Sequence, residues 1–150
     1  MKRKLTALFL AAVAMTAFES EACTNILVSK GATKDGSTMI TYTADSHQLY
    51  GCLYFHPAAK YPVGTMMPVY EWDTGKYLGE IAQVPETYST VGNMNEHQLI
   101  ITESTFGGRG LGDSTGIIDY GTLIYTTLQR AKTAREAIRV MSDLVNTYGY

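Results

Sequence analysis

The beginning of the chain is hydrophobic without any one-sided pattern. Residues 2–4 are basic, and residues 5–18 are apolar apart from two threonines. Such a run is too short to span a bilayer as a mature helix, and it lacks the single apolar stripe of a helix that packs on a core. The small residues Ser20 and Ala22 stand where a signal peptidase reads the chain ahead of Cys23. We therefore predict that residues 1–22 are a cleaved export signal, and that the mature protein is periplasmic or extracellular.

A strand pattern begins directly after Cys23. In residues 24–29, Ile26 and Val28 alternate with their neighbours, which is the period of a β-strand. Residues 30–37 contain an Asp-Gly pair, which is a turn signal, and residues 38–43 are β-branched and aromatic. Together they predict a β-hairpin whose first strand starts next to Cys23.

The middle of the chain predicts short strands and long loops. Residues 50–88 are rich in aromatic side chains and are interrupted by four prolines, so we expect some of these loops to line a groove. Two further strands are predicted at residues 89–91 and 99–103, around a turn at residues 93–97 that contains Asn95. The glycine-rich residues 106–110 predict a flexible backbone segment near a site.

Two helices close the chain. Residues 119–131 have apolar side chains at helical spacing, and residues 133–148 begin with the capping box of Thr133 and Glu136. The predicted apolar face of the second helix comprises Ile138, Met141, Leu144, Val145 and Tyr148. Strands followed by a helical pair on one face of a sheet predict an α+β fold with antiparallel strands. Because nothing covers the other face, we expect residues 23–150 to be the amino-terminal part of a longer domain.

Composition narrows the function classes. The 150 residues carry 12 Lys and Arg against 14 Asp and Glu, a net charge of −2, without a basic cluster in the part after the signal. Nucleic acid is therefore not an expected partner. No later apolar run is long enough to span a membrane, and no Cys or His pair has metal-ligand spacing. We predict neither a metal nor another cofactor.

Cys23 is the main candidate for chemistry. As the first residue of the mature chain it carries a thiol, with an ordinary pKa of about 8.5, and a free α-amino group, with an ordinary pKa of about 8. The amine can take the thiol proton near neutral pH, so one residue supplies a nucleophile and its base. This arrangement predicts amide hydrolysis through a covalent intermediate.

Three alternatives for this region stay open. An exported protein with two cysteines can pair them, here Cys23 with Cys52, as a disulfide. A lipoprotein would carry lipid on Cys23 and block its amine, although Ser20 and Glu21 are not the residues expected before a lipidated cysteine. The hydrophobic beginning would instead be a buried helix if it were not cleaved.

Several motifs resemble the dipeptidase A family of cysteine dipeptidases, which belongs to the N-terminal-nucleophile hydrolase superfamily. They are Cys23-Thr24-Asn25-Ile26-Leu27-Val28-Ser29-Lys30, Asp35-Gly36-Ser37, Tyr70-Glu71-Trp72-Asp73-Thr74-Gly75, Gly92-Asn93-Met94-Asn95-Glu96 and Glu103-Ser104-Thr105-Phe106-Gly107-Gly108-Arg109. The resemblance implies an αββα four-layer sandwich, hydrolysis of short peptides and no metal. An acylase of bile-acid or penicillin type, or a lipid-anchored binding protein, is the alternative function.

The resemblance also assigns candidate site residues. It implies that Cys23 is the nucleophile and base, and that Asp45 hydrogen-bonds the cysteine, although Asp45 also fits an ordinary turn. Tyr42 stands where related amidases have an arginine. An oxyanion donor falls on Thr105, with Glu103 and Ser104 beside it. If Glu103 is buried at a strand end, it can bind the free amino group of a substrate, and further site residues are expected beyond Tyr150.

Overall fold

The computed structural model describes residues 23–45, 51–105 and 115–150. The predicted export signal and the glycine-rich residues 106–110 lie outside the described residues. Within them, antiparallel strands are combined with two α-helices, which confirms the α+β class. No helix of the described ranges is both long and apolar enough to cross a membrane.

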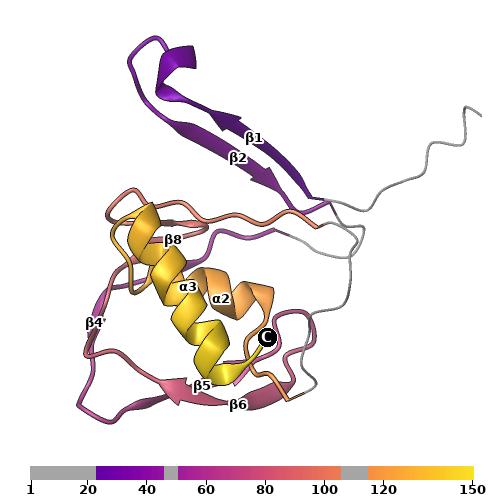
Figure 1. The fold of residues 1–150 in the computed structure, drawn as a ribbon, viewed down its shortest axis with the longest axis vertical. Coiled ribbons are helices and arrows are strands. Elements are labelled where there is room, and N and C mark those ends of the chain that lie inside the picture. Colours follow the sequence, from indigo (N-terminus) through magenta and orange to yellow (C-terminus); the bar gives the residue numbers. More distant parts are fainter. Residues whose placement is uncertain (1–22, 46–50, 106–114) are drawn as a thin grey trace, which may run out of the picture.

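The predicted hairpin is present. Strand β1 (Thr24–Val28) pairs antiparallel with β2 (Met39–Thr43), from Thr24 opposite Thr43 to Val28 opposite Met39. The turn between them contains the short 3-10 helix η1 (Lys30–Ala32). Figure 1 shows the hairpin projecting from the rest of the molecule, with its turn far from the helices. Only the end of the hairpin that carries Cys23 is close to the body.

The middle of the chain forms short strands joined by loops, as predicted. The longest pair is β5 (Met66–Tyr70) with β6 (Tyr77–Ala82). The remaining strands are two residues long and comprise β3 (Phe55–His56), β4 (Ala59–Lys60), β7 (Glu86–Thr87), β8 (Thr90–Val91) and β9 (Met94–Asn95). They pair as β4 with β7 and as β3 with β8 and β9. The predicted strand at residues 99–103 is wrong, because only an isolated bridge between Ile100 and Met94 forms there.

Both helices form close to their predicted bounds. Helix α2 (Tyr120–Leu128) is capped by the side chain of Asp119, and α3 (Ala134–Tyr148) has the predicted capping box at Thr133. The predicted apolar face is wrong at one position: Ile138 is 66% exposed, whereas Ala137 is 4% exposed. The buried face of α3 therefore includes Ala137 in place of Ile138, and it keeps the predicted Leu144.

Two hydrophobic clusters hold the body together. The first joins α2 to the segment after β9, and the second packs α3 and Ile118 on β5 and β6. Their buried members are Leu99, Ile101, Ile124, Leu128, Ala131 and Ala137 in the first, and Val69, Ile81, Ile118 and Leu144 in the second. Figure 1 shows both helices on one side of β5 and β6. The described residues thus contain one helical layer on one face of this pair, and the four-layer sandwich stays a prediction.

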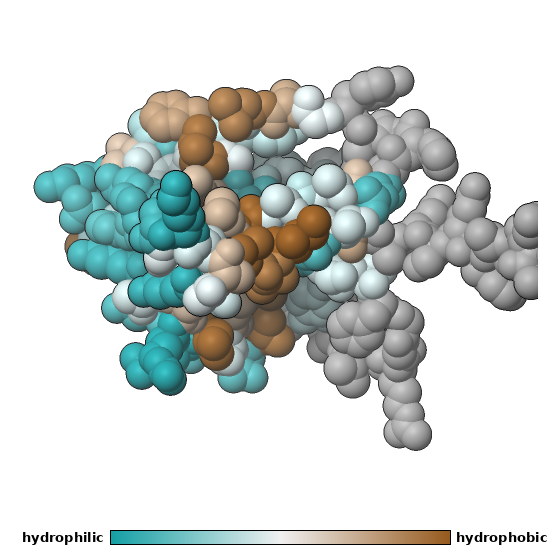
Figure 2. All heavy atoms as spheres, turned by 90° about the horizontal axis from the view of Figure 1, so that it is seen from above, coloured by the Kyte–Doolittle hydropathy of each residue, from teal (hydrophilic) through white to brown (hydrophobic). Residues whose placement is uncertain are grey.

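The hairpin contributes little to this core. Ile26 and Leu27 in β1 are 58% and 72% exposed, and Met39 in β2 is 49% exposed. Figure 2 looks down on this end of the molecule and shows hydrophobic side chains at the surface. These side chains bury little apolar surface against the body. The position of the hairpin therefore depends on the polar contacts at its Cys23 end.

Candidate active site

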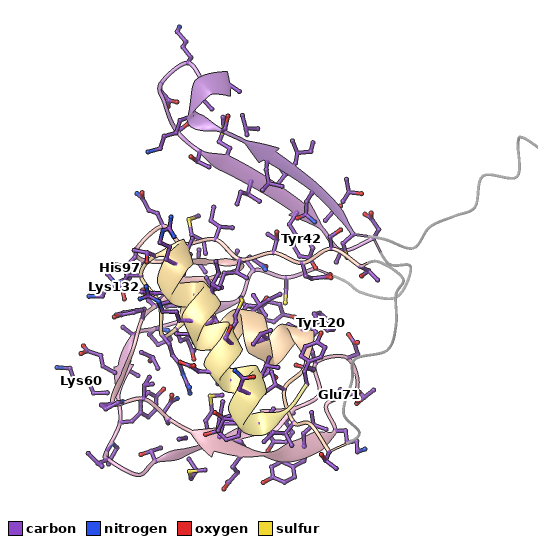
Figure 3. All side chains as sticks on the ribbon, viewed as in Figure 1. Tyr42, Lys60, Glu71, His97, Tyr120 and Lys132 are labelled. Atoms are coloured by element: carbon purple, nitrogen blue, oxygen red, sulfur yellow. The ribbon has the colours of Figure 1, made fainter. Side chains whose placement is uncertain are left out.

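The geometry of the hairpin brings three polar side chains together. Side chains alternate between the two faces of a strand, so Cys23 and Asn25 lie on the same face of β1. Asn25 pairs with Tyr42 in β2, and directly paired residues share a face. Cys23, Asn25 and Tyr42 therefore lie on one face, and Figure 3 places Tyr42 where the hairpin meets the body.

The segment after Ile101 attaches this face to the body. The side-chain amide of Asn25 donates a hydrogen bond of 2.7 Å to the backbone carbonyl of Glu103. The hydroxyl of Ser104 lies 3.5 Å from the backbone carbonyl of Cys23, to which it donates a long hydrogen bond. These contacts fix the backbone of Glu103 beside the hairpin, and its carboxylate reaches the thiol.

One oxygen of the Glu103 carboxylate accepts two hydrogen bonds. The thiol Sγ of Cys23 donates to Oε1 over 2.9 Å, and the hydroxyl of Tyr42 donates to the same oxygen over 3.0 Å. The thiol and the hydroxyl are 4.0 Å apart. The second oxygen, Oε2, has a long contact of 3.4 Å from the hydroxyl of Thr105. Oε1 is therefore well satisfied, whereas Oε2 retains most of its capacity to accept hydrogen bonds.

This arrangement favours the protonated thiol. Burial raises the pKa of the Cys23 thiol, and the hydrogen bond to Glu103 and the charge of Glu103 raise it further. The backbone of Asp45 and the hydroxyl of Tyr42 act in the opposite direction, and the net pKa remains above its ordinary value. Burial and Glu103 also raise the pKa of Tyr42, so this side chain is a neutral donor at physiological pH.

Asp45 lies next to the cysteine, but its carboxylate has other partners. Its two oxygens accept hydrogen bonds from the hydroxyl of Thr24, at 2.7 Å, and from the hydroxyl of Thr43, at 2.9 Å. The contribution of Asp45 to the thiol comes from its backbone, which lowers the pKa of Cys23. In this structure the Asp45 side chain fixes the open end of the hairpin on which Cys23 lies.

Asn95 positions the segment that carries Glu103. This side chain is 5% exposed, and its amide donates to the carbonyls of Leu128 and Ala131 over 2.8 and 2.7 Å. Its oxygen accepts from the backbone amides of His97 and Leu99 over 3.0 and 3.1 Å. Asn95 is therefore more than the predicted turn residue, because it ties the loop before residues 99–105 to the end of α2.

The Glu-Trp-Asp motif fastens a second loop to the other end of α2. The indole of Trp72 stacks on Tyr125 with ring centres 4.7 Å apart, and its backbone amide donates to Asp119. Asp73 accepts a hydrogen bond of 2.7 Å from the hydroxyl of Tyr120. Burial, then Asp73 and the charge of Glu103, raise the pKa of Tyr120. Tyr120 thus lies within the electrostatic reach of the site, at the start of α2 (Figure 3).

The structure brings together most of the predicted site residues. Cys23, Glu103, Ser104 and Thr105 are in contact, and Asp45 contacts Cys23 through its backbone. The sequence reasoning did not place Tyr42 in contact with Glu103. The alternation of the hairpin could have shown that Tyr42 shares the face of Cys23, since a register that pairs Asn25 with Tyr42 puts both on that face.

Two further expectations concern cysteines and metals. Both Cys23 and Cys52 are free, and Cys52 is exposed near Tyr54, so the alternative disulfide is not formed in this structure. Among residues 23–45, 51–105 and 115–150, no group of three His, Cys, Asp or Glu side chains is arranged to hold a metal ion.

Comparison with protein families gives a match that covers all of the described residues. Peptidase family C69 matches residues 22–57 and 47–150. The chain belongs to Peptidase family C69. This confirms the predicted membership of the dipeptidase A family, and the family match starts one residue before Cys23.

A curated relative is known for this member of Peptidase family C69. The chain is 28% identical over 152 aligned positions to a protein of Latilactobacillus sakei described as "Probable dipeptidase". The alignment covers 87% of this chain and 31% of the relative, so the chain spans about a third of that protein. No solved structure matches the chain.

Proposed function

We propose that this protein is an exported cysteine-type dipeptidase that uses Cys23 as an amino-terminal nucleophile. The observation that carries the proposal is the contact of the Cys23 thiol with Glu103 at 2.9 Å, at the start of β1 and on the face of the hairpin toward the body. Membership of Peptidase family C69 and the name of the Latilactobacillus relative support peptides as substrates.

Cleavage after Ala22 is part of the proposal. It would free the α-amino group of Cys23, and the family match from residue 22 onward supports this boundary. The amine then takes the thiol proton, and the thiolate attacks the carbonyl carbon of the scissile peptide bond. The C–N bond breaks, the amine returns its proton to the leaving group, and a thioester remains on Cys23. Water hydrolyses this thioester and restores the thiol.

Glu103 supplies a reason for a preference for dipeptides. Its carboxylate lies beside the proposed nucleophile, and within the part of the chain that the structure describes Oε2 has only the long contact with Thr105. A dipeptide carries its α-ammonium group on the residue whose carbonyl carbon is attacked, within reach of such a carboxylate. Longer chains cleaved in their interior have no ammonium group there, so the charge of Glu103 favours short substrates. Thr105 and Ser104 are the nearby hydroxyls that would act as donors to the oxyanion.

The wider fold belongs to the same proposal. The family resemblance implies an αββα four-layer sandwich, and the single helical layer on β5 and β6 is one part that such a sandwich requires. In that architecture the exposed apolar residues of the hairpin, Ile26 and Leu27, would be covered by a further layer.

The test is turnover of a dipeptide panel by the secreted protein and its cysteine variants. Cys23→Ala should abolish hydrolysis and Cys23→Ser should weaken it severely, whereas Cys52→Ser, at the exposed cysteine, should keep the wild-type rate. Glycine and taurine conjugates of a bile acid, assayed in parallel, test the acylase alternative. Wild-type turnover of dipeptides by Cys23→Ala would contradict the proposal, as would hydrolysis of the conjugates alone.

A further inference from the structure

The Glu103 carboxylate has two opposing effects on the proposed reaction. Its Oε1 accepts a hydrogen bond from the Cys23 thiol, with 2.9 Å between Sγ and Oε1. Its negative charge opposes formation of the thiolate. The same carboxylate is the group that a substrate ammonium would pair with. A carboxylate against the sulfur therefore needs a role beyond the activation of the thiol.

Among the described residues, no cationic side chain shifts the pKa of the Cys23 thiol. Tyr42 from β2, Asp45 after β2 and Glu103 are the neighbours that shift the pKa of Cys23, and none of them is positive. The neighbours that shift the pKa of Tyr42 are Glu103 and Cys23, again without a cation. Tyr120 at the start of α2 adds a neutral hydroxyl, whose partner Asp73 is another carboxylate. In the form that can accept the thiol proton the α-amino group of Cys23 is neutral, so the described side chains leave the site negative before a substrate binds.

The carboxylate is also held in one orientation. Asn25 fixes the backbone of Glu103 through its carbonyl, and Tyr42 holds Oε1 at 3.0 Å. Among the described residues, Oε2 has only the contact of 3.4 Å with Thr105. A cation that approaches Oε2 meets an acceptor that is already positioned, so little ordering is lost on binding.

We propose that Glu103 makes activation of Cys23 dependent on the substrate: the ammonium group of a bound dipeptide pairs with Glu103, neutralises its charge and releases the thiol for ionisation. The proposal rests on the proposed dipeptidase function and adds a switch to it. In the empty site the thiol stays protonated and hydrogen-bonded to Oε1. When the ammonium occupies Oε2, the thiol proton passes to the α-amino group of Cys23, and the sulfur attacks the carbonyl carbon. Tyr42 is a positioning residue in this scheme.

The enzyme would therefore select substrates with a free α-ammonium group twice, once when they bind and again at the chemical step. An N-acetylated dipeptide has no ammonium group, so it would leave Glu103 negative and Cys23 protonated. The switch also protects an exported thiol from oxidation in the absence of substrate, because the thiolate is the form that oxidants attack.

The test is a titration of the Cys23 thiol with and without bound ligand. The full-length mature protein is labelled with ¹³C at cysteine Cβ in a Cys52→Ser background, so that one signal reports the protonation of Cys23. The ligand is a dipeptide isostere in which a carbinol replaces the scissile carbonyl, and the control ligand is its N-acetyl derivative. We expect the free amine to lower the midpoint by about one pH unit, which is about tenfold more thiolate below the midpoint. The N-acetyl derivative should leave the midpoint unchanged.

Variants separate the switch from general effects of binding. Glu103→Gln keeps the size of the side chain and one acceptor oxygen but removes the negative charge, and it should lower the midpoint without ligand and abolish the response to the amine. Glu80→Gln removes an exposed carboxylate on β6 and should keep the wild-type response. An unchanged midpoint at saturation, equal shifts with both ligands, or failure of the free amine to bind would overturn the proposal. If wild-type protein then still hydrolyses dipeptides and Cys23→Ala does not, the dipeptidase function stands and only the switch is wrong.

Discussion

The thiol of Cys23 donates a hydrogen bond to the carboxylate of Glu103, 80 residues further along the chain, over 2.9 Å. The contact joins the start of the hairpin to the segment that follows Ile101. It also sets the resting state of the site, because a thiol that donates to a carboxylate is held in its protonated form. Several properties of the protein follow from this pair and from the residues that position it.

Glu103→Gln should make Cys23 more reactive at neutral pH in the absence of substrate. Burial and Glu103 raise the pKa of the thiol, so at a given pH the wild-type site contains less thiolate than an ordinary cysteine. Removal of the negative charge lowers this pKa and moves the pH profile of alkylation to lower pH. The rate of iodoacetamide labelling of the Cys23 peptide, measured from pH 6 to 10, reports the shift. A profile that stays in place or moves upward would contradict the account.

Tyr42→Phe should move the same profile in the opposite direction. The hydroxyl of Tyr42 lowers the pKa of the thiol and shares Oε1 of Glu103 with it. Without the hydroxyl, Cys23 is the remaining side-chain donor on Oε1 among the described residues, and its proton is held more tightly. We expect slower alkylation at neutral pH than in wild type, with the same assay as the readout. Opposite shifts in Glu103→Gln and Tyr42→Phe are hard to produce by a general loosening of the site, which would move both profiles together.

Asn95→Ala should destabilise the protein strongly. Asn95 is buried, and it satisfies two carbonyls at the end of α2 and two backbone amides of its own loop. Loss of buried partners of this kind costs about 3 kcal/mol or more of unfolding free energy. Chemical denaturation of the variant measures the loss, with Asn146→Ala on the exposed surface of α3 as the matched control. A loss in Asn95→Ala no larger than in the control would show that the hydrogen bonds are not formed.

Gly121→Ala should also destabilise the protein, although alanine is the better helix former by about 1 kcal/mol. A Cβ atom at position 121 would lie 2.5 Å from the ring of Trp72, which packs against α2 there. Overpacking of this kind costs about 1–3 kcal/mol.

The double variant Trp72→Ala with Gly121→Ala separates the two effects on α2. In the Trp72→Ala background the clash is absent, so Gly121→Ala should become neutral or stabilising. A thermal melt of each variant gives the comparison. The same destabilisation by Gly121→Ala in both backgrounds would contradict the packing shown here.

Local patterns in the sequence predicted much of the fold. The alternation after Cys23 and the Asp-Gly turn gave the hairpin, and Thr133 with Glu136 gave the start of α3. Such signals lie within a few residues of the element that they predict, so they can be read without knowledge of the tertiary structure. The position of Ile138 could not be read in this way, because the choice between Ala137 and Ile138 as the buried residue depends on where α3 packs.

Cys23 could be chosen as the candidate nucleophile from the sequence, but most of the contacts around it could not be predicted. The predicted export signal and the strand after it pointed to Cys23. The contact between Glu103 and Tyr42 joins residues 61 positions apart, and the role of Asn95 depends on carbonyls 33 and 36 positions away. Such contacts are set by the packing of α2 and the hairpin. The strand expected at residues 99–103 failed for a similar reason, since the segment forms side-chain contacts with β1 and only one bridge with β9.

Mass spectrometry of the amino-terminal peptide of the secreted protein, after a turnover of an amino-acid ester is quenched in acid, tests the central claim most directly. The account predicts a peptide that begins at Cys23 and carries one aminoacyl group on that residue. A mature peptide that begins elsewhere, a lipid on Cys23, or an acyl group found on another side chain in place of Cys23 would contradict it.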